Sequence, residues 1–402
     1  MVTLENIKEA RKNLKGIIKK TSLDHSKTFS ELSKNDIYLK LENLQKTGSF
    51  KVRGASNKIA KLTEEEKKSG VVAASAGNHA QGVALAASKA GIKSTIVMPK
   101  GAPIAKVKAT KGYGADVILH GNSYDEAHER ELEFSRETGA TIIHAFDDLD
   151  VIAGQGTIGL EILEDLPDVD VVVAPIGGGG LLSGIAVAVK SINPSIQVIG
   201  VQAAEAASMK ESIKSGKPIT LSSVDTIADG IAVKRPGNST FDIISKYVDG
   251  IVTVNEEEIA HTISLLIERA KLTVEGAGAT ALAAVINDKV SFQGKKIAVV
   301  LSGGNIDLDM ISSIIDRGMV KGGRRLVITT SLPDSPGALQ KILCVIGDTG
   351  ANVISVNHDR TSSDITYKQA EVKFVLGTKD HEHIEKIIEV IKNNGYKIKK
   401  IR

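Results

Sequence analysis

The sequence feature that most constrains the fold is a regular alternation of short apolar runs and longer amphipathic runs between residues 70 and 144. The apolar runs have the length and composition of strands, and the segments between them are long enough for helices. This alternation predicts a buried parallel sheet with right-handed crossovers. We expect strands at Val71–Ala74, Ser94–Met98, Asp116–Leu119 and Thr141–His144, and helices at Asn78–Ala90, Pro103–Lys111 and Tyr124–Thr138.

The chain on either side predicts a second α/β sheet. We expect a helix at Leu149–Asp165, strands at Val171–Ala174, Gln197–Val201, Ile251–Val254 and Lys296–Leu301, and helices that include Leu181–Lys190 and Glu256–Ala270. Near the N-terminus, helical spacing of apolar residues predicts an amphipathic helix over Leu4–Ile18, and an apolar run predicts a strand over Ile37–Leu41. We interpret Leu23–Ser26 as a loop, with His25 as a surface residue.

A change of rhythm after residue 323 indicates a separate C-terminal domain. Two glycines and exposed charges make Arg317–Gly323 a candidate linker. The elements expected after it are strands at Leu326–Thr330, Asn352–His358, Gln369–Leu376 and Tyr396–Ile401, and helices at Pro336–Thr349 and Glu382–Asn393. The order βαββαβ predicts a ferredoxin-like fold.

Composition excludes several classes of protein. The 402 residues are 42% apolar and 25% charged with a net charge of +3, as in ordinary globular proteins of two or three domains. Interspersed charges and 3% aromatic residues argue against nucleic-acid binding. The single Cys344 excludes an intramolecular disulfide and a thiolate metal cage. With neither a signal peptide nor a membrane-spanning run apparent, we expect a cytoplasmic protein without membrane contacts.

The first candidate reactive group is Lys51. It follows an apolar strand and a polar loop that holds Gly48 and Ser49, and it lies between Phe50 and Val52. An ammonium group among apolar neighbours is poorly solvated, which favours the neutral amine that Schiff-base chemistry requires. The same stretch is equally compatible with a surface lysine in the first turn of a helix.

Two loops of small residues follow predicted strands and precede predicted helices: Ser75–His79 and Gly177–Gly180. Backbone N–H groups at such positions bind anions, helped by the helix dipole. Four successive glycines are entropically costly in a generic turn, whereas they suit a backbone that wraps around a phosphate. Tight packing between strand and helix is the alternative, and we expect it to explain one or two of the glycines.

These loops, together with Ser49–Ala55 and Ser302–Asn305, resemble pyridoxal-phosphate (PLP) enzymes of the tryptophan-synthase-β fold type, and most of all threonine dehydratases (threonine ammonia-lyases). The resemblance covers roughly residues 5–320. It implies the two-domain α/β architecture called fold type II, with parallel sheets covered by helices. Residues 48–150 would form a small domain, and residues 1–47 and 151–320 a large one. Residues 321–402, with a Leu332–Leu339 turn, resemble an ACT domain.

The resemblance also implies roles for individual residues. Lys51 would be the Schiff-base lysine and the base that acts at the substrate Cα. The implied cofactor-binding residues are Lys51, Phe50, Asn78, Gly177, Gly178, Gly179, Gly180 and Ser302, and the implied substrate-binding residues are Ser75, Ala76, Gly77, Asn78 and His79. Phe50 and His79 are equally compatible with ordinary packing. Asp229 and Glu275 lie on loops near these motifs and receive no role.

The implied reaction is elimination of water from L-threonine, which gives 2-oxobutanoate and ammonia, with L-serine as a poorer substrate. Serine racemases resemble the catalytic half too, but they carry a serine where this chain has Ala76, and alanine cannot protonate a second face of Cα. Their divalent-metal loop has no counterpart at Gln202, Ala206 and Ser208, so we expect no such metal site. A non-catalytic amino-acid sensor is a third reading, which the presence of Lys51 disfavours.

The ACT resemblance implies regulation by an amino acid, isoleucine or valine. The candidate regulatory residues are Asp334, Pro336, Gly337 and Asn352. Pairing of these domains would produce a homodimer or homotetramer. The metabolic role, isoleucine biosynthesis or threonine degradation, stays open, as does whether the effector activates or inhibits the enzyme. The alternative is an ACT domain that only supports assembly.

Overall fold

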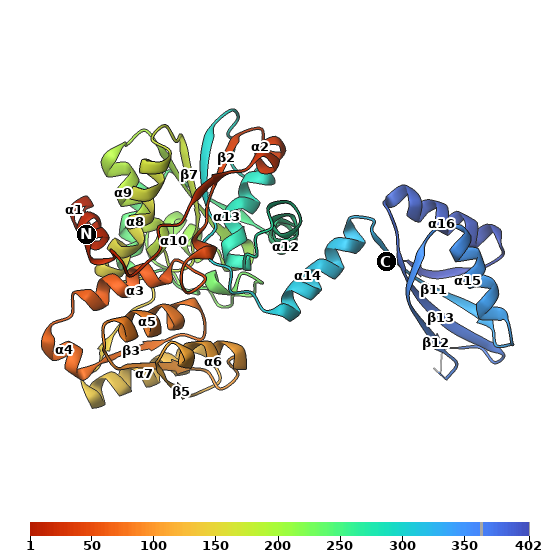
Figure 1. Cartoon of the computed structure of the whole chain (residues 1–402), viewed down its shortest axis with the longest axis horizontal. Helices are drawn as coiled ribbons and strands as arrows, with labels where there is room; N and C mark the ends of the chain where they lie inside the picture. The colour runs from red at the N-terminus through yellow and green to blue at the C-terminus, as the bar shows by residue number, and fades with distance from the viewer. Residues whose placement is uncertain (362–364, 402) are drawn as a thin grey trace. The chain divides into compact units, whose positions relative to one another are not determined.

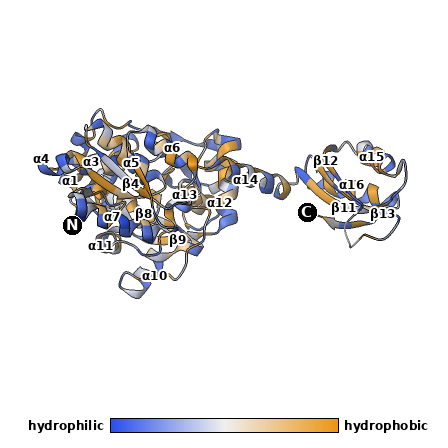
Figure 2. Ribbon diagram, turned by 90° about the horizontal axis from the view of Figure 1, so that it is seen from below, coloured by the Kyte–Doolittle hydropathy of each residue, from blue (hydrophilic) through white to orange (hydrophobic). Residues whose placement is uncertain are grey.

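The structure, a computed structural model, describes residues 1–361 and 365–401. The chain divides into two compact units, Met1–Ile306 and Asp307–Arg402. Figure 1 shows the elements of each unit, and Figure 2 shows hydrophobic residues on strands such as β4 and β11 and hydrophilic residues on outer helices such as α4. The predicted α/β fold class is confirmed, with two parallel sheets in the first unit and an antiparallel sheet in the second.

The smaller sheet of the first unit is the one predicted from the alternation. Its strands are β3 (Val71–Ala74), β4 (Ser94–Met98), β5 (Asp116–Leu119) and β6 (Thr141–Ile142), parallel and in the order β5-β4-β3-β6. Its helices are α3 (Lys51–Ala60), α4 (Glu64–Ser69), α5 (Asn78–Lys89), α6 (Ile104–Gly112) and α7 (Tyr124–Thr138). Side chains of α3 and α5 pack on one face, and Ala127 and Phe134 of α7 on the other.

The larger sheet has the order β1-β2-β10-β7-β8-β9, and only the pairing of β1 with β2 is antiparallel. Its strands are β1 (Leu23–His25), β2 (Asp36–Lys40), β7 (Val171–Pro175), β8 (Gln197–Ala203), β9 (Gly250–Val254) and β10 (Lys296–Val300). The remaining helices are α1 (Leu4–Asn13), α2 (Lys27–Ser33), η1 (Glu42–Leu44), α8 (Leu149–Asp165), α9 (Gly180–Ile192), η2 (Ala204–Ala206), α10 (Ser208–Ser215), η3 (Asp229–Ile231), α11 (Asn238–Tyr247), α12 (Glu256–Leu265), η4 (Leu266–Ala270) and α13 (Gly276–Ile286). Buried aliphatic residues of α8 and α9 pack against β7, β8 and β10.

Three local predictions were wrong. The first helix ends at Asn13 because Gly16, with φ of +79°, turns the chain, and Ile17 bonds back to the Leu14 carbonyl. The expected loop at Leu23–Ser26 contains β1, whose three residues pair with β2; His25 is exposed, as predicted. The expected linker is helical up to Lys321 and is part of α14, in which Ile314 is buried.

The second unit begins with α14 (Leu308–Lys321) and continues as the predicted βαββαβ order. Its other elements are β11 (Arg325–Pro333), α15 (Ala338–Asp348), β12 (Asn352–Asp359), β13 (Gln369–Gly377), α16 (His381–Asn393) and β14 (Ile398–Ile401). The strands form an antiparallel sheet in the order β12-β13-β11-β14. Alternate residues of β11 and β13 are buried, and Ile342 and Ile387 of the two helices cover that face.

Within residues 1–361 and 365–401, no helix combines the length and the apolar character that crossing a membrane requires.

Candidate active site

The candidate residues lie in loops that follow the carboxyl ends of parallel strands. Lys51 comes after β2 and the short helix η1, Gly177–Gly180 after β7, Ser302 after β10 and Ser75–His79 after β3. Parallel strands end at a common edge of their sheet, where ligands of open α/β folds bind. The larger sheet therefore brings three of these loops to one edge, and the fourth ends a strand of the smaller sheet.

Lys51 is the first residue of α3 and is partly buried. Its Nζ donates a hydrogen bond to the Ala145 carbonyl at 3.1 Å and lies 5.3 Å from the centroid of the Phe50 ring. Burial lowers the pKa of Lys51 to about 8, although the charge of Glu275 acts in the opposite direction. A sizeable fraction of this amine is thus neutral near physiological pH, as covalent chemistry with a carbonyl requires.

Backbone hydrogen bonds join the loop before Lys51 to the loop of Ser302. Ser49 forms an isolated antiparallel bridge with Gly303, and the Phe50 N–H donates to the Ser302 carbonyl at 3.1 Å. Gly48 has φ of +70°, and a Cβ there would lie 2.4 Å from Asn305 Oδ1. This position therefore needs glycine for both its conformation and its close approach.

A chain of side-chain amides ends at a buried carboxylate. Asn78 Nδ2 donates to Glu275 Oε1 at 2.7 Å, and Asn78 Oδ1 accepts from Asn305 Nδ2 at 2.8 Å. Burial raises the pKa of Glu275 to about 7, and the charge of Asp229 adds to this effect. From the sequence alone, Glu275 receives no role and Asn305 is only the last residue of a motif, because no pattern indicates that both contact Asn78.

The four glycines after β7 are all tightly packed. A Cβ on Gly178 would lie 2.3 Å from the Phe146 ring, one on Gly180 2.8 Å from the Phe146 carbonyl, and one on Gly177 3.0 Å from Ile231 Cα. Gly179 has φ of +102°. The expectation that packing explains only one or two of these glycines was wrong, because Phe146 lies against the loop. Packing and anion binding are compatible, since the loop also begins α9.

The Ser75–His79 loop leads into α5. Ser75 Oγ accepts a hydrogen bond from the Gly77 N–H at 3.1 Å. His79 is buried, and its Nε2 hydrogen-bonds the Ile143 carbonyl at 2.6 Å. Burial, together with the charge of Lys51, lowers the pKa of His79 to about 3, so the ring is neutral. The His79 side chain is therefore a packed, hydrogen-bonded group, while backbone N–H groups of the first turn of α5 lack intrahelical acceptors.

The candidate regulatory residues do not come together within one chain. Asp334, Pro336 and Gly337 form the turn between β11 and α15, where Asp334 pairs with Arg360 at 3.2 Å. Asn352 pairs with Gly377, whereas the last residue of β11, Pro333, pairs with Gln369 at the other end of β13. At about 3.3 Å per residue, these ends of the sheet are roughly 26 Å apart.

Comparison with known proteins decides the family. Residues 14–303 match the family model described as pyridoxal-phosphate dependent enzyme, and residues 325–396 match an ACT domain. This chain is a member of that PLP-dependent family. An L-threonine ammonia-lyase of Thermotoga maritima is 54% identical over 399 residues, which is 99% of both chains. The predicted resemblance to threonine dehydratases is thereby confirmed.

Solved structures agree on the catalytic fold. Maize serine racemase superposes with a TM-score of 0.75 at 36% identity, covering 79% of this chain and 98% of its own. The processed form of threonine deaminase isoform 2 from Solanum lycopersicum gives a TM-score of 0.72 at 38% identity, covering 77% and 88%. Fold similarity alone does not separate racemase from deaminase, so the choice depends on individual residues.

The residues around Lys51 fit the cofactor of the family. The hydroxyls of Thr47 and Ser49 are buried and have no hydrogen-bond partner within residues 1–361 and 365–401. Buried unpaired hydroxyls near a partly buried lysine are expected where a polar ligand completes the site. The N-terminus of α9 supplies backbone N–H groups suited to a phosphate.

Proposed function

We propose that this chain is a PLP-dependent L-threonine ammonia-lyase that converts L-threonine to 2-oxobutanoate and ammonia, with L-serine as a secondary substrate. The observation that carries the proposal is Lys51, a partly buried amine whose pKa is lowered to about 8 at the edge where the motif loops meet. The full-length match to the Thermotoga maritima relative, named L-threonine ammonia-lyase, supports the substrate.

Each candidate residue would have a separate role. Lys51 would hold the cofactor covalently and would serve as the base at the substrate Cα, and the Ala145 carbonyl accepts a hydrogen bond from its Nζ. Bound PLP supplies an electron sink that weakens the Cα–H bond. Gly177–Gly180 would bind the phosphate, Phe50 would pack along the ring, and Asn78 would donate to its 3-oxygen. Ser302 would offer the ring nitrogen a neutral hydroxyl, and Ser75–His79 would bind the substrate carboxylate through backbone N–H groups.

The test compares the purified wild-type chain with Lys51→Ala after both are incubated with PLP. We expect a visible cofactor band in the wild type, an altered band in the variant, and release of 2-oxobutanoate from L-threonine by the wild type alone. A wild type that stays colourless after reconstitution would refute the enzyme function and favour the amino-acid sensor.

Serine racemisation is the second candidate, supported by the similarity to maize serine racemase. Ala76 argues against it, because a methyl group supplies no proton. The divalent-metal loop of serine racemases also has no counterpart here, since Gln202 makes hydrogen bonds within the fold. Its Oε1 accepts from the Lys210 N–H at 2.9 Å, and its Nε2 donates to the Ala206 carbonyl at 3.2 Å. Production of D-serine without oxo acid would reverse this preference.

We further propose that residues 1–320 form the catalytic region and residues 321–402 the regulatory domain, in a cytoplasmic homodimer or homotetramer. Isoleucine or valine would bind at Asp334, Pro336 and Gly337. Asn352 lies at the opposite end of its own sheet, so it would reach that site only from a second copy. Isoleucine titration of both activity and sedimentation tests this assignment.

A further inference from the structure

Glu275 is a buried carboxylate in the candidate active site that the proposed reaction does not use. It precedes α13, its side chain does not cap that helix, and it is 4% exposed. A Cβ on Gly303 would lie 2.3 Å from Glu275 Oε1, which shows how closely the Ser302 loop covers this group. Burying a carboxylate costs free energy, so packing alone does not account for a glutamate at this position.

The hydrogen bonds that lead to Glu275 have a fixed direction. The Thr47 carbonyl can only accept, and it accepts from Asn305 Nδ2 at 2.8 Å. The same Nδ2 donates to Asn78 Oδ1, which orients the Asn78 amide from its oxygen side. An ionised Glu275 can also only accept, and it fixes the nitrogen side of Asn78 at 2.7 Å.

We propose that Glu275 is a positioning residue that acts through Asn78. By accepting one Asn78 N–H, with Asn305 holding the amide oxygen, Glu275 makes Asn78 present its second N–H, and not an acceptor, to the bound cofactor. This inference rests on the proposed function only for the identity of the cofactor. The hydrogen-bond directions follow from the protein atoms themselves.

The charges that face Glu275 make this arrangement sensitive to pH. Lys106 on α6 is positive, Lys51 on α3 is positive when its amine is protonated, and Asp229 of η3 is negative. Burial and Asp229 raise the pKa of Glu275 by more than the hydrogen bonds from Asn78 and the Asn305 backbone and the charge of Lys106 lower it. The pKa of Glu275 is raised to about 7, so protonation sets in as the pH falls through neutrality. A protonated carboxyl group can donate as well as accept, and the orientation of Asn78 is then less strictly imposed.

The experiment uses the full-length chain and records the cofactor absorbance of the holoenzyme against pH for the wild type and Glu275→Gln. The affinity for PLP is measured for the wild type, Glu275→Ala, Asn78→Ala and the double variant. Glutamine keeps the shape and an acceptor oxygen but does not titrate. We expect a spectral transition with a midpoint near 7 in the wild type that is absent from Glu275→Gln. The equilibrium dissociation constant of PLP should rise about 3- to 10-fold in Glu275→Ala, the effect of losing one oriented hydrogen bond.

The Asn78→Ala background separates positioning from general damage. If Glu275 acts through Asn78, adding Glu275→Ala to Asn78→Ala should change cofactor affinity by less than about twofold. Equal effects in both backgrounds, or a wild-type transition retained by Glu275→Gln, would overturn the proposal. Neither readout requires turnover, so a wild type that binds PLP but releases no 2-oxobutanoate would refute the proposed function and leave this inference intact.

Discussion

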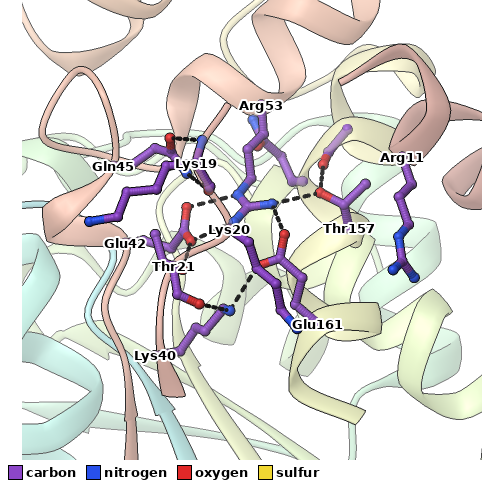
Figure 3. A network of polar contacts seen from close by, with 12 residues as sticks. Arg11, Lys19, Lys20, Thr21, Lys40, Glu42, Gln45, Arg53, Thr157 and Glu161 are labelled. Carbon is purple, nitrogen blue, oxygen red and sulfur yellow. Dashed lines mark hydrogen bonds and ion pairs between the residues drawn. The ribbon is translucent and has the colours of Figure 1, made fainter. Parts of the chain in front are cut away.

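Replacement of Arg53 by methionine tests how helix α3, which begins at Lys51, is held in place. Arg53 lies on α3 two residues after Lys51 and is fully buried with Glu42, Lys40 and Glu161 (Figure 3). Its guanidinium donates to both oxygens of Glu42 at 2.7 and 2.8 Å and to both oxygens of Glu161 at 2.7 and 2.9 Å. Lys40 Nζ completes the group, 2.7 Å from Glu161 Oε2.

The expected cost follows from the charges. Two cations and two carboxylates sum to zero in the wild type, whereas Arg53→Met leaves Lys40 with two carboxylates and one uncompensated buried negative charge. Removing one partner of a buried ion pair costs about 3–5 kcal/mol. Arg11→Met is the control, because Arg11 binds Glu164 of the same helix α8 at the exposed surface, and such pairs contribute little.

The pH dependence gives a sharper test. Burial acts to raise the pKa of Glu42, but Arg53 outweighs it and the pKa lies below its usual value. In the wild type Glu42 therefore contributes stability that is lost as the pH falls through its folded pKa. Without Arg53 the folded pKa rises above the unfolded value, so the variant's penalty is largest at pH above that folded pKa and shrinks as acid neutralises Glu42.

Urea unfolding followed by far-UV circular dichroism at about pH 8 and about pH 5 measures both effects. We expect the free energy of unfolding of Arg53→Met to fall further below the wild-type value at the higher pH, and Glu42→Gln to restore part of it. A loss no larger than that of Arg11→Met, or one independent of pH, would refute this reasoning.

Three further predictions concern the site itself. Gly178→Ala should lower the unfolding temperature through a cost of about 1–3 kcal/mol, because its Cβ would meet the Phe146 ring, while Gly101→Ala, with no neighbour within 4 Å, should not. The rate at which apoenzyme captures PLP should rise with pH and level off above about 8, as the Lys51 amine becomes neutral; a flat absorbance-based rate profile would contradict this. Ala76→Ser should produce D-serine, detectable by chiral chromatography, because the serine hydroxyl supplies the proton that alanine lacks. If the variant forms no D-serine, the main argument against a racemase fails.

The sequence was a good guide where local patterns determine structure. The bounds of β3, β4, β5, α7 and α8 agree with the predicted ones, because apolar strands buried on both faces alternate with clear helical segments. Three-residue β1 escaped detection, since its stability comes from pairing with β2 and not from its own composition. The order of the strands was equally hidden: β10 lies beside β2 although more than 250 residues separate them.

The same distinction applies to the site. Motifs singled out Lys51, Ser302 and Asn78 as candidates, because each lies in or directly after a loop whose glycines mark a close approach of the backbone. They could not reveal Glu275, whose significance lies in one contact with Asn78 across 197 positions of sequence. A carboxylate beside a glycine is usually a turn residue, and only its burial and the direction of its hydrogen bonds separate the two cases. Local sequence thus predicts which groups can react, whereas strand order determines which neighbours orient them.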